Sequence, residues 1–145
     1  MSVNEFLKEQ EVEFKDNINL LAEKESFVSL IIKDYEKESN YEIKIIKWGF
    51  VYSGYVELIG FLLYNSLKMK DCKSAGQVFT KINHPYLDSI DHRIRNSFQH
   101  LDFKIKEELY CKTKEGFRKV SEEEMNSKLE IIKKKYAELK KYLLQ

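Results

Sequence analysis

The segment from Tyr41 to Met69 constrains the fold more than any other part of the chain, because it is apolar on most sides. After Glu42, Glu57 is its sole acidic residue. A helix that is apolar almost all round must be covered by neighbours on several sides. One stripe consists of residues mostly three or four apart: Ile45, Trp48, Tyr52, Tyr55, Ile59, Leu62 and Leu63. The segment therefore predicts the central helix of a bundle. Polar residues interrupt it too often for a membrane span.

Residues that break helices are scarce in the rest of the chain, which has one proline and five glycines in 145 residues. Ser39 and Asn40 predict a break and an N-cap. Before them, helical spacing runs through Leu7, Phe14, Ile18, Leu21, Val28, Ile32 and Tyr35. A capping-box pattern, Ser121 followed by Glu124, predicts the start of a last helix. Its apolar stripe is Met125, Leu129, Ile132, Tyr136, Leu139 and Leu143. Residues 70–83 predict a loop with a short helix at 77–82.

Residues 103–120 alternate between apolar and charged side chains, with a turn candidate from Thr113 to Gly116. That alternation is typical of strands and predicts a small β-hairpin before the last helix. The chain is therefore expected to form a single domain over residues 1–145. The expected fold is mainly α, an up-and-down bundle of about four to five helices with the hairpin inserted before the final one.

Composition excludes several classes of protein. Hydrophobic residues make up 43% and charged residues 34% of the chain, which is typical of a soluble globular domain. The net charge is +1, so any affinity for nucleic acid must come from a local patch. Cys72 and Cys111 lack a metal or redox spacing and are interpreted as reduced thiols of a cytoplasmic protein. The polar N-terminal residues do not resemble a signal peptide, and no interaction with a membrane is expected.

A further helix is predicted from Pro85 to about Leu101, since proline suits a first helical turn. Its apolar stripe is Leu87, Ile90, Ile94, Phe98 and Leu101. This segment holds two of the three arginines and two of the three histidines of the chain: Arg93, Arg95, His92 and His100.

At about 100° per residue, Arg95, His92, Asn96 and His100 are predicted to share the side opposite the apolar stripe. Asp91 precedes Arg95 by one turn and could pair with it. Glu57 has two interpretations, an exposed carboxylate on the polar edge of its helix or a partner that holds an arginine of this one. The pattern leaves open whether the polar side meets water, a partner chain or a substrate.

Arginine and histidine together suit the cleavage of RNA by its own 2′-hydroxyl. The guanidinium matches phosphate oxygens and stabilises charge at phosphorus, and the imidazole takes or gives a proton near neutral pH. The sequence contains no Walker loop, GxSxG, HExxH or CxxC pattern. No metal site and no cofactor are expected.

The run Arg95-Asn96-Ser97-Phe98-Gln99-His100 resembles the signature of the HEPN superfamily, an arginine followed after four to six residues by histidine, often with a polar residue after the arginine. The preceding IDHRI, the following Phe103 and the order of the predicted elements also resemble bacterial members of abortive-infection type. The resemblance implies a metal-independent endoribonuclease, often a toxin or an antiphage effector. It also implies a homodimer in which two motif helices form one composite cleft.

By this resemblance Arg95 would bind the scissile phosphate, His100 would act as general base or acid, and Asn96 would orient one of them. Glu57, His92 and Arg93 are supporting candidates outside the matched motif. The implied partners are an RNA substrate, a second copy of the chain and an antitoxin protein.

Two positions depart from the family pattern. Some HEPN toxins carry a tyrosine two residues after the histidine, which an antitoxin modifies with AMP, and here that residue is Asp102. Many members have glycine or another small residue directly after the histidine, and here it is Leu101. Two alternatives stay open: a non-catalytic HEPN module that binds a nucleotide or a protein, and a helical adaptor in which the motif is only a charged surface.

Overall fold

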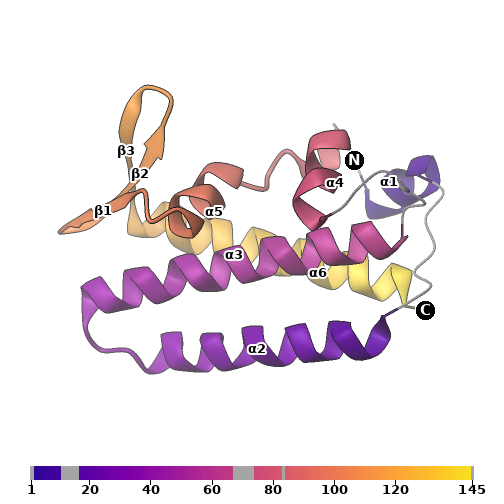
Figure 1. The fold of residues 1–145 in the computed structure, drawn as a ribbon, viewed down its shortest axis with the longest axis horizontal. Coiled ribbons are helices and arrows are strands. Elements are labelled where there is room, and N and C mark those ends of the chain that lie inside the picture. Colours follow the sequence, from indigo (N-terminus) through magenta and orange to yellow (C-terminus); the bar gives the residue numbers. More distant parts are fainter. Residues whose placement is uncertain (1, 11–16, 67–73, 83, 145) are drawn as a thin grey trace.

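Three long helices lie side by side and form the body of the molecule: α2 (Ile18–Lys37), α3 (Tyr41–Ser66) and α6 (Glu122–Leu143). The computed structural model describes residues 2–10, 17–66, 74–82 and 84–144. Figure 1 shows the smaller elements on the side of α3 that faces away from α2. These are α1 (Val3–Gln10), α4 (Ala75–Lys81), the 3₁₀-helix η1 (Pro85–Leu87), α5 (His92–Gln99), β1 (Phe103–Lys106), β2 (Glu108–Thr113) and β3 (Gly116–Val120). The predicted fold class, mainly α with a small β element before the last helix, is confirmed.

The predicted central helix, α3, is at the centre of the core. Its side chains pack against α2, α6, α4 and α5, and Trp48, Tyr52 and Ile59 are fully buried. The Trp48 indole N–H donates a hydrogen bond to the Met125 carbonyl oxygen at 3.2 Å, which joins α3 to the start of α6. Burial of each such side chain contributes about 1.5–3 kcal/mol.

Helix α3 is the one described helix that is long and apolar enough to cross a membrane, and 67% of its most apolar window is buried inside the protein. This burial is what the core helix of a soluble protein requires.

The predicted helix starts are confirmed by their caps. The Asn40 side chain accepts the Ile43 N–H at 3.0 Å, and the Ser121 hydroxyl accepts the Glu124 N–H at 3.1 Å. All six residues of the last predicted stripe are buried on α6. The expected short helix at 77–82 is α4. Phe14, Cys72 and residues 70–73 and 83 lie outside the described residues, whereas Cys111 is a buried thiol.

The continuous helix predicted from Pro85 to Leu101 is wrong, because the chain is extended at Asp91 and divides the segment. Pro85 begins η1, and α5 begins only at His92. The Asp91 carboxylate accepts the N–H groups of Arg93 and Ile94 at 3.0 and 3.3 Å, so it is the N-cap of a new helix. The N–H of Asp91 itself donates to the Tyr52 hydroxyl at 2.8 Å, which ties this cap to α3.

Phe98 fixes α5 to α3. Its ring lies against Gly49, where an added Cβ would be 2.0 Å from the nearest Phe98 ring carbon. The ring also contacts Trp48 edge-on at 6.3 Å and stacks on Phe103 at 4.4 Å between centroids. Because position 49 is glycine, α5, the motif helix, can approach α3 closely.

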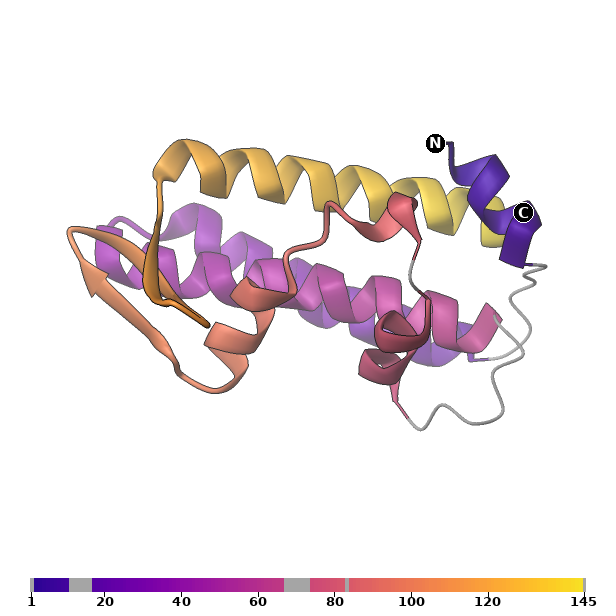
Figure 2. The same cartoon turned by 90° about the horizontal axis from the view of Figure 1, so that it is seen from above.

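The predicted hairpin is the β2–β3 part of a three-stranded antiparallel sheet, in the order β1-β2-β3. Leu109 pairs with Val120 and Cys111 with Arg118 across β2 and β3. Gly116 has φ of 109°, a conformation that suits glycine, and it closes the predicted turn. The sheet lies beside α5, near the start of α6, as Figure 2 shows from above.

Candidate functional site

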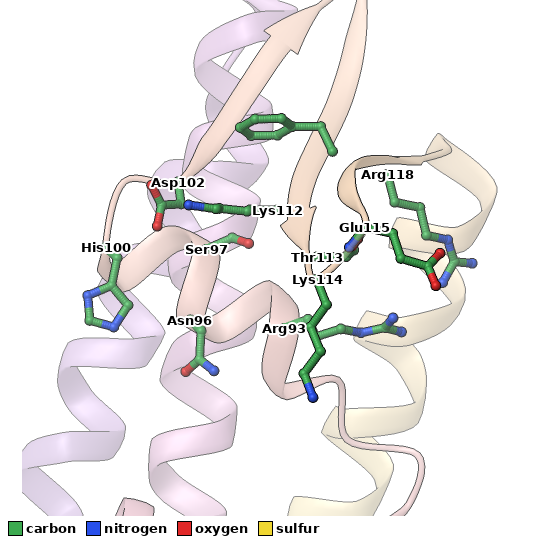
Figure 3. Close-up of a pocket in the computed structure, with 11 residues that line it drawn as sticks. Arg93, Asn96, Ser97, His100, Asp102, Lys112, Thr113, Lys114, Glu115 and Arg118 are labelled. Carbon is green, nitrogen blue, oxygen red and sulfur yellow. The ribbon is translucent and has the colours of Figure 1, made fainter.

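Helix α5 has two polar sides, and the predicted site residues are divided between them. Asn96, His100 and Arg93 line an open hollow between α5 and the sheet (Figure 3). Arg95 and His92 lie on the side that faces α4, where His92 contacts Phe79. The expectation that Arg95, His92, Asn96 and His100 share one side is therefore wrong.

The sheet-side hollow has a volume of about 900 Å³. Four of its lining residues are cationic: Arg93, Lys112, Lys114 and Arg118. Two are acidic, Asp102 and Glu115, and the others are Asn96, Ser97, His100, Thr113 and Phe117. The lining has four cations against two carboxylates, but Arg93 also lies 3.6 Å from Asp91 and Arg118 lies 3.3 Å from Glu124, so the surplus of positive charge comes mainly from Lys112 and Lys114. Such a site attracts anionic ligands.

His100 ends α5 and places its side chain at the open edge of the hollow. Its N–H donates to the Asn96 carbonyl oxygen at 3.0 Å, and its ring is exposed. Figure 3 shows His100 at one side of the hollow near Asp102, Asn96 pointing out from the middle of α5, and Arg93 on the opposite side, pointing toward the hairpin that carries Lys114 and Arg118. An accessible imidazole at the edge of a hollow that holds cations can exchange protons with a bound phosphate ester.

Arg95 is held by Glu57 on the other side of α5. The two charged groups are 2.6 Å apart, and the side chains are 15% and 44% exposed respectively. Gly76 of α4 lies over the guanidinium, since an added Cβ there would be 3.4 Å from Nη2. Nε of Arg95 is buried, and no hydrogen-bond partner for it is found among the described residues. The interpretation of Glu57 as the partner of an arginine is thus confirmed.

The expected pairing of Asp91 with Arg95 is wrong. The Asp91 carboxylate instead contacts the Lys128 ammonium at 2.9 Å and Arg93 Nε at 3.6 Å. Burial raises the pKa of Asp91, but the Lys128 hydrogen bond and charge, the Ile94 N–H and Arg93 outweigh it and hold this pKa below its usual value. Asp91 therefore keeps its negative charge at neutral pH.

His92 is half-buried, and its ring centroid lies 4.8 Å from that of Phe79. Burial and the nearby charge of Arg95 lower the pKa of His92, and Asp91 offsets this only in part. The imidazole is therefore neutral at pH 7. Its position on the α4 side makes it a packing residue, separate from the hollow that holds His100.

The residues of the hollow that come from the hairpin were missed by the sequence-based site prediction. Lys112, Phe117 and Arg118 follow the motif by more than ten residues, and only the fold brings them beside α5. A signal for them was present in the alternation of residues 103–120. It placed Lys104, Lys106, Tyr110 and Lys112 an even number of residues apart, which in strands is one side of the sheet, whereas Arg118 pairs with Cys111 on the other side.

Among the described residues, no group of three or more His, Cys, Asp or Glu side chains is placed to hold a metal ion. No protein-family model, curated protein or solved structure was found to match the chain. The function must therefore be argued from the chemistry of the two sides of α5.

Proposed function

We propose that this protein is a metal-independent endoribonuclease that cleaves RNA in the sheet-side hollow. The observation that supports this most directly is the exposed imidazole of His100 in a hollow that also holds four cationic side chains. RNA supplies both reactants, a 2′-hydroxyl nucleophile and a neighbouring phosphodiester. The protein has only to move protons and stabilise charge.

The proposed step transfers one proton at each end of the reaction. The His100 imidazole removes the 2′-hydroxyl proton as the oxygen attacks phosphorus. The bond from phosphorus to the 5′-oxygen then breaks, and that oxygen receives a proton from a second acid. The products are a 2′,3′-cyclic phosphate and a 5′-hydroxyl. Arg93, together with the hairpin cations, stabilises the added negative charge on the phosphoryl oxygens.

A second histidine would supply the acid, and in this proposal it comes from a second copy of the chain. Each chain contributes only His100 to the hollow, since His92 packs on α4 and His84 is buried against Glu9. Two copies that meet at their motif helices would bring two His100 side chains and two basic hollows into one composite site.

Leu101 and Phe50 mark the surface where the second copy would pack. Leu101 is 73% exposed, although its φ of 56° lies in the left-handed region, which costs a non-glycine residue about 1–2 kcal/mol. The exposed ring of Phe50, on α3, contacts Phe98 of α5. The exposed Leu101 side chain buries little apolar surface within its own chain. We propose that it packs against the second copy across the dimer interface.

Arg95 has a positioning role in this proposal. It does not line the hollow, and its pair with Glu57 joins α5 to α3. The phosphate contact that the motif resemblance assigned to Arg95 is given instead to Arg93. The resemblance to HEPN toxins supplies the biological part of the proposal: a cytoplasmic toxin or antiphage effector, with an antitoxin protein as a further partner.

The test is to incubate the purified protein with RNA in EDTA and to identify the ends of the fragments. We expect 2′,3′-cyclic phosphate and 5′-hydroxyl ends, and a loss of about 100-fold or more in rate for His100→Ala. Gln99→Ala is the matched control on the neighbouring exposed position and should cleave normally. Equal cleavage by the protein and by His100→Ala would contradict the proposal, as would no cleavage by either.

Arg93→Ala and Arg95→Ala separate the two roles assigned to arginine. Arg93→Ala should weaken RNA binding, and the salt dependence of the remaining binding should be shallower, because a phosphate contact is lost. Arg95→Ala should lower the stability of the fold while RNA binding by the folded protein keeps its salt dependence. The reverse pattern would return the phosphate contact to Arg95.

The second candidate function is a non-catalytic module that binds a nucleotide or a partner protein. The placement of Arg95 favours it, because the motif arginine and the motif histidine lie on different sides of α5. It predicts that nucleotides raise the unfolding temperature, in a manner that depends on Arg93 and Lys112, without any RNA turnover.

A further inference from the structure

The outward side of the β-sheet is basic and aromatic. In an antiparallel sheet, directly paired residues point to the same side, and the register pairs Lys104 with Tyr110, Tyr110 with Lys119, and Lys112 with Phe117. The opposite side carries Leu109, Cys111 and Val120, which are buried. We define the outer sheet face by its alternating residues: Lys104, Lys106, Glu108, Tyr110, Lys112, Phe117 and Lys119.

The outer sheet face concentrates positive charge. Four exposed lysines stand there against one glutamate, Glu108, which is paired with Lys119. Because the whole chain has a net charge of only +1, this cluster is a local feature and not part of a general basic surface. Lysines spaced along a sheet can follow the phosphates of an extended nucleic-acid strand.

Phe117 lies on the edge strand β3 of this surface, next to the turn at Gly116. It is 42% exposed, and the Lys104 ammonium lies 4.2 Å from the centroid of its ring. Phe117 and Lys112 also line the sheet-side hollow, so the outer sheet face runs directly into the proposed cleavage site. The Lys104 ammonium covers one side of the Phe117 ring, so an unpaired base would stack on the other side while its phosphates meet the lysines.

We propose that the outer sheet face binds single-stranded RNA, with one base stacked on Phe117 and the flanking phosphates at Lys104, Lys112 and Lys119. This inference rests on the proposed function, because it names the class of RNA that would be led toward His100. Duplex RNA is a poor fit, since the faces of its bases are already stacked within the helix. The strand would cross the sheet and enter the hollow where Lys112 and Phe117 meet α5.

The test measures binding apart from cleavage, in the His100→Ala background. An unstructured RNA of about 12 nucleotides and a stable duplex of the same composition are compared by filter binding. We expect the single strand to bind more tightly. Phe117→Ala should weaken its binding about 5- to 150-fold, the range for loss of one stacked base. Phe117→Tyr keeps an aromatic face and should bind within about twofold of its parent.

Two controls make the test specific. Phe27→Ala removes a more exposed phenylalanine from α2, on the other side of the molecule, and should leave RNA binding unchanged. Lys112→Gln and Lys119→Gln should each reduce the salt dependence of binding, by about 0.7 in the slope of log affinity against log salt concentration. Circular dichroism confirms that each variant is folded.

Several results would overturn the inference. They are unchanged binding by Phe117→Ala, a preference for the duplex, or tighter binding of phosphatidylserine vesicles than of single-stranded RNA. These outcomes differ from failure of the proposed function. Phe117-dependent binding of single-stranded RNA by a protein that never cleaves RNA would refute the nuclease and retain the outer sheet face as an RNA-binding surface.

Discussion

The pair formed by Arg95 and Glu57 is asymmetric, because the arginine is mostly buried and the glutamate is partly exposed. Removal of the carboxylate leaves the guanidinium without its partner in a position with little solvent. Loss of the glutamate is therefore expected to be the costlier of the two losses. A surface ion pair would be worth only a few tenths of a kcal/mol to about 1 kcal/mol, and burial on one side raises that value.

A double-mutant cycle with Glu57→Gln and Arg95→Met measures this pair. We expect a coupling free energy of about 1–2 kcal/mol from urea unfolding, with Glu57→Gln alone destabilising the protein. The matched pair on the surface, Arg118 and Glu124, is 3.3 Å apart with a 57% exposed arginine. It should show about 0.5 kcal/mol or less. Equal coupling in both cycles would mean that Arg95 is not held as described.

Gly49 is the position where a single methyl group should have the largest effect. The added Cβ of Gly49→Ala would lie 2.0–2.2 Å from ring carbons of Phe98, so either the ring or α5 must move. We expect a loss of about 1–3 kcal/mol in the free energy of unfolding. Gly76→Ala is the control. Its nearest contact is 3.4 Å, and alanine in a helix is favoured over glycine by roughly 0.5–1 kcal/mol.

At the scale of elements, α5 owes its short length to one cap. Asp91 starts the helix with two hydrogen bonds, and the chain leaves it at Leu101, where φ is positive. The eight residues of α5 have little helical stability of their own. Their conformation depends on Asp91 and on the burial of Ile94 and Phe98 against α3.

The cap should make part of the stability dependent on pH. The pKa of Asp91 in the folded protein lies below its ordinary value of 3.8. The stabilisation that the ionised Asp91 carboxylate gives the fold is therefore complete above pH 3.8, and it is lost as pH falls through the lowered pKa. Asp91→Asn keeps the cap oxygen but removes the charge, so it should cost about 1–2 kcal/mol at pH 7.

Urea unfolding of the protein and of Asp91→Asn at pH 7 and at about pH 3 tests the cap. The difference in the free energy of unfolding between the protein and Asp91→Asn should be smaller at the lower pH. Asp88→Asn is the control, because it changes an exposed carboxylate in the same connection. Its free energy of unfolding should differ less from that of the parent protein at both pH values. A difference in stability between the protein and Asp91→Asn that grows as pH falls would contradict the claim that the charge of Asp91 stabilises the fold.

The long helices could be predicted from sequence because their apolar stripes have the helical period over several turns. Residues such as Trp48 and Ile132 are buried where that period places them. The break at Asp91 could not be predicted in this way, because the stripe from Leu87 to Leu101 continues across it. Local cap chemistry and the hydrogen bond to Tyr52, which is distant in sequence, decide where α5 begins.

The site was predictable only in part, for a geometric reason. Residues five apart on a helix differ by about 140° around its axis, so Arg95 and His100 can both avoid the core and still point to different neighbours. Which neighbours they meet depends on α4 and on the hairpin. The positions of Gly76 and Lys112 relative to α5 follow from the packing of the whole chain, not from the motif.

At the scale of the whole molecule, exposed apolar side chains occur on several elements, and two groups of them are candidates for a dimer interface. One is the surface of Leu101 and Phe50 beside the motif helix. The other lies on α2 and includes Leu20, Phe27 and Leu30. The proposed function assigns the homodimer to the first of these, because Leu101 directly follows His100 in the chain.

Substitution of a charged residue on each surface tests which of the two forms the dimer interface. We expect Leu101→Asp to shift the protein from dimer to monomer in sedimentation velocity and to lower RNA cleavage in parallel, because the composite site needs both copies. Phe27→Asp should change neither. Loss of the dimer with Phe27→Asp, and its persistence with Leu101→Asp, would move the interface to α2 and contradict the composite site.

Trp48 is the single tryptophan of the chain, fully buried and in edge-on contact with Phe98 of the motif helix. Its position makes it an intrinsic optical probe at the junction of α3, α5 and α6. Its emission should be shifted to short wavelength in the native protein. Displacement of α5 should alter the emission even where overall helicity is unchanged. One spectrum of each variant would thus distinguish an altered surface from a motif helix that has come away from the core.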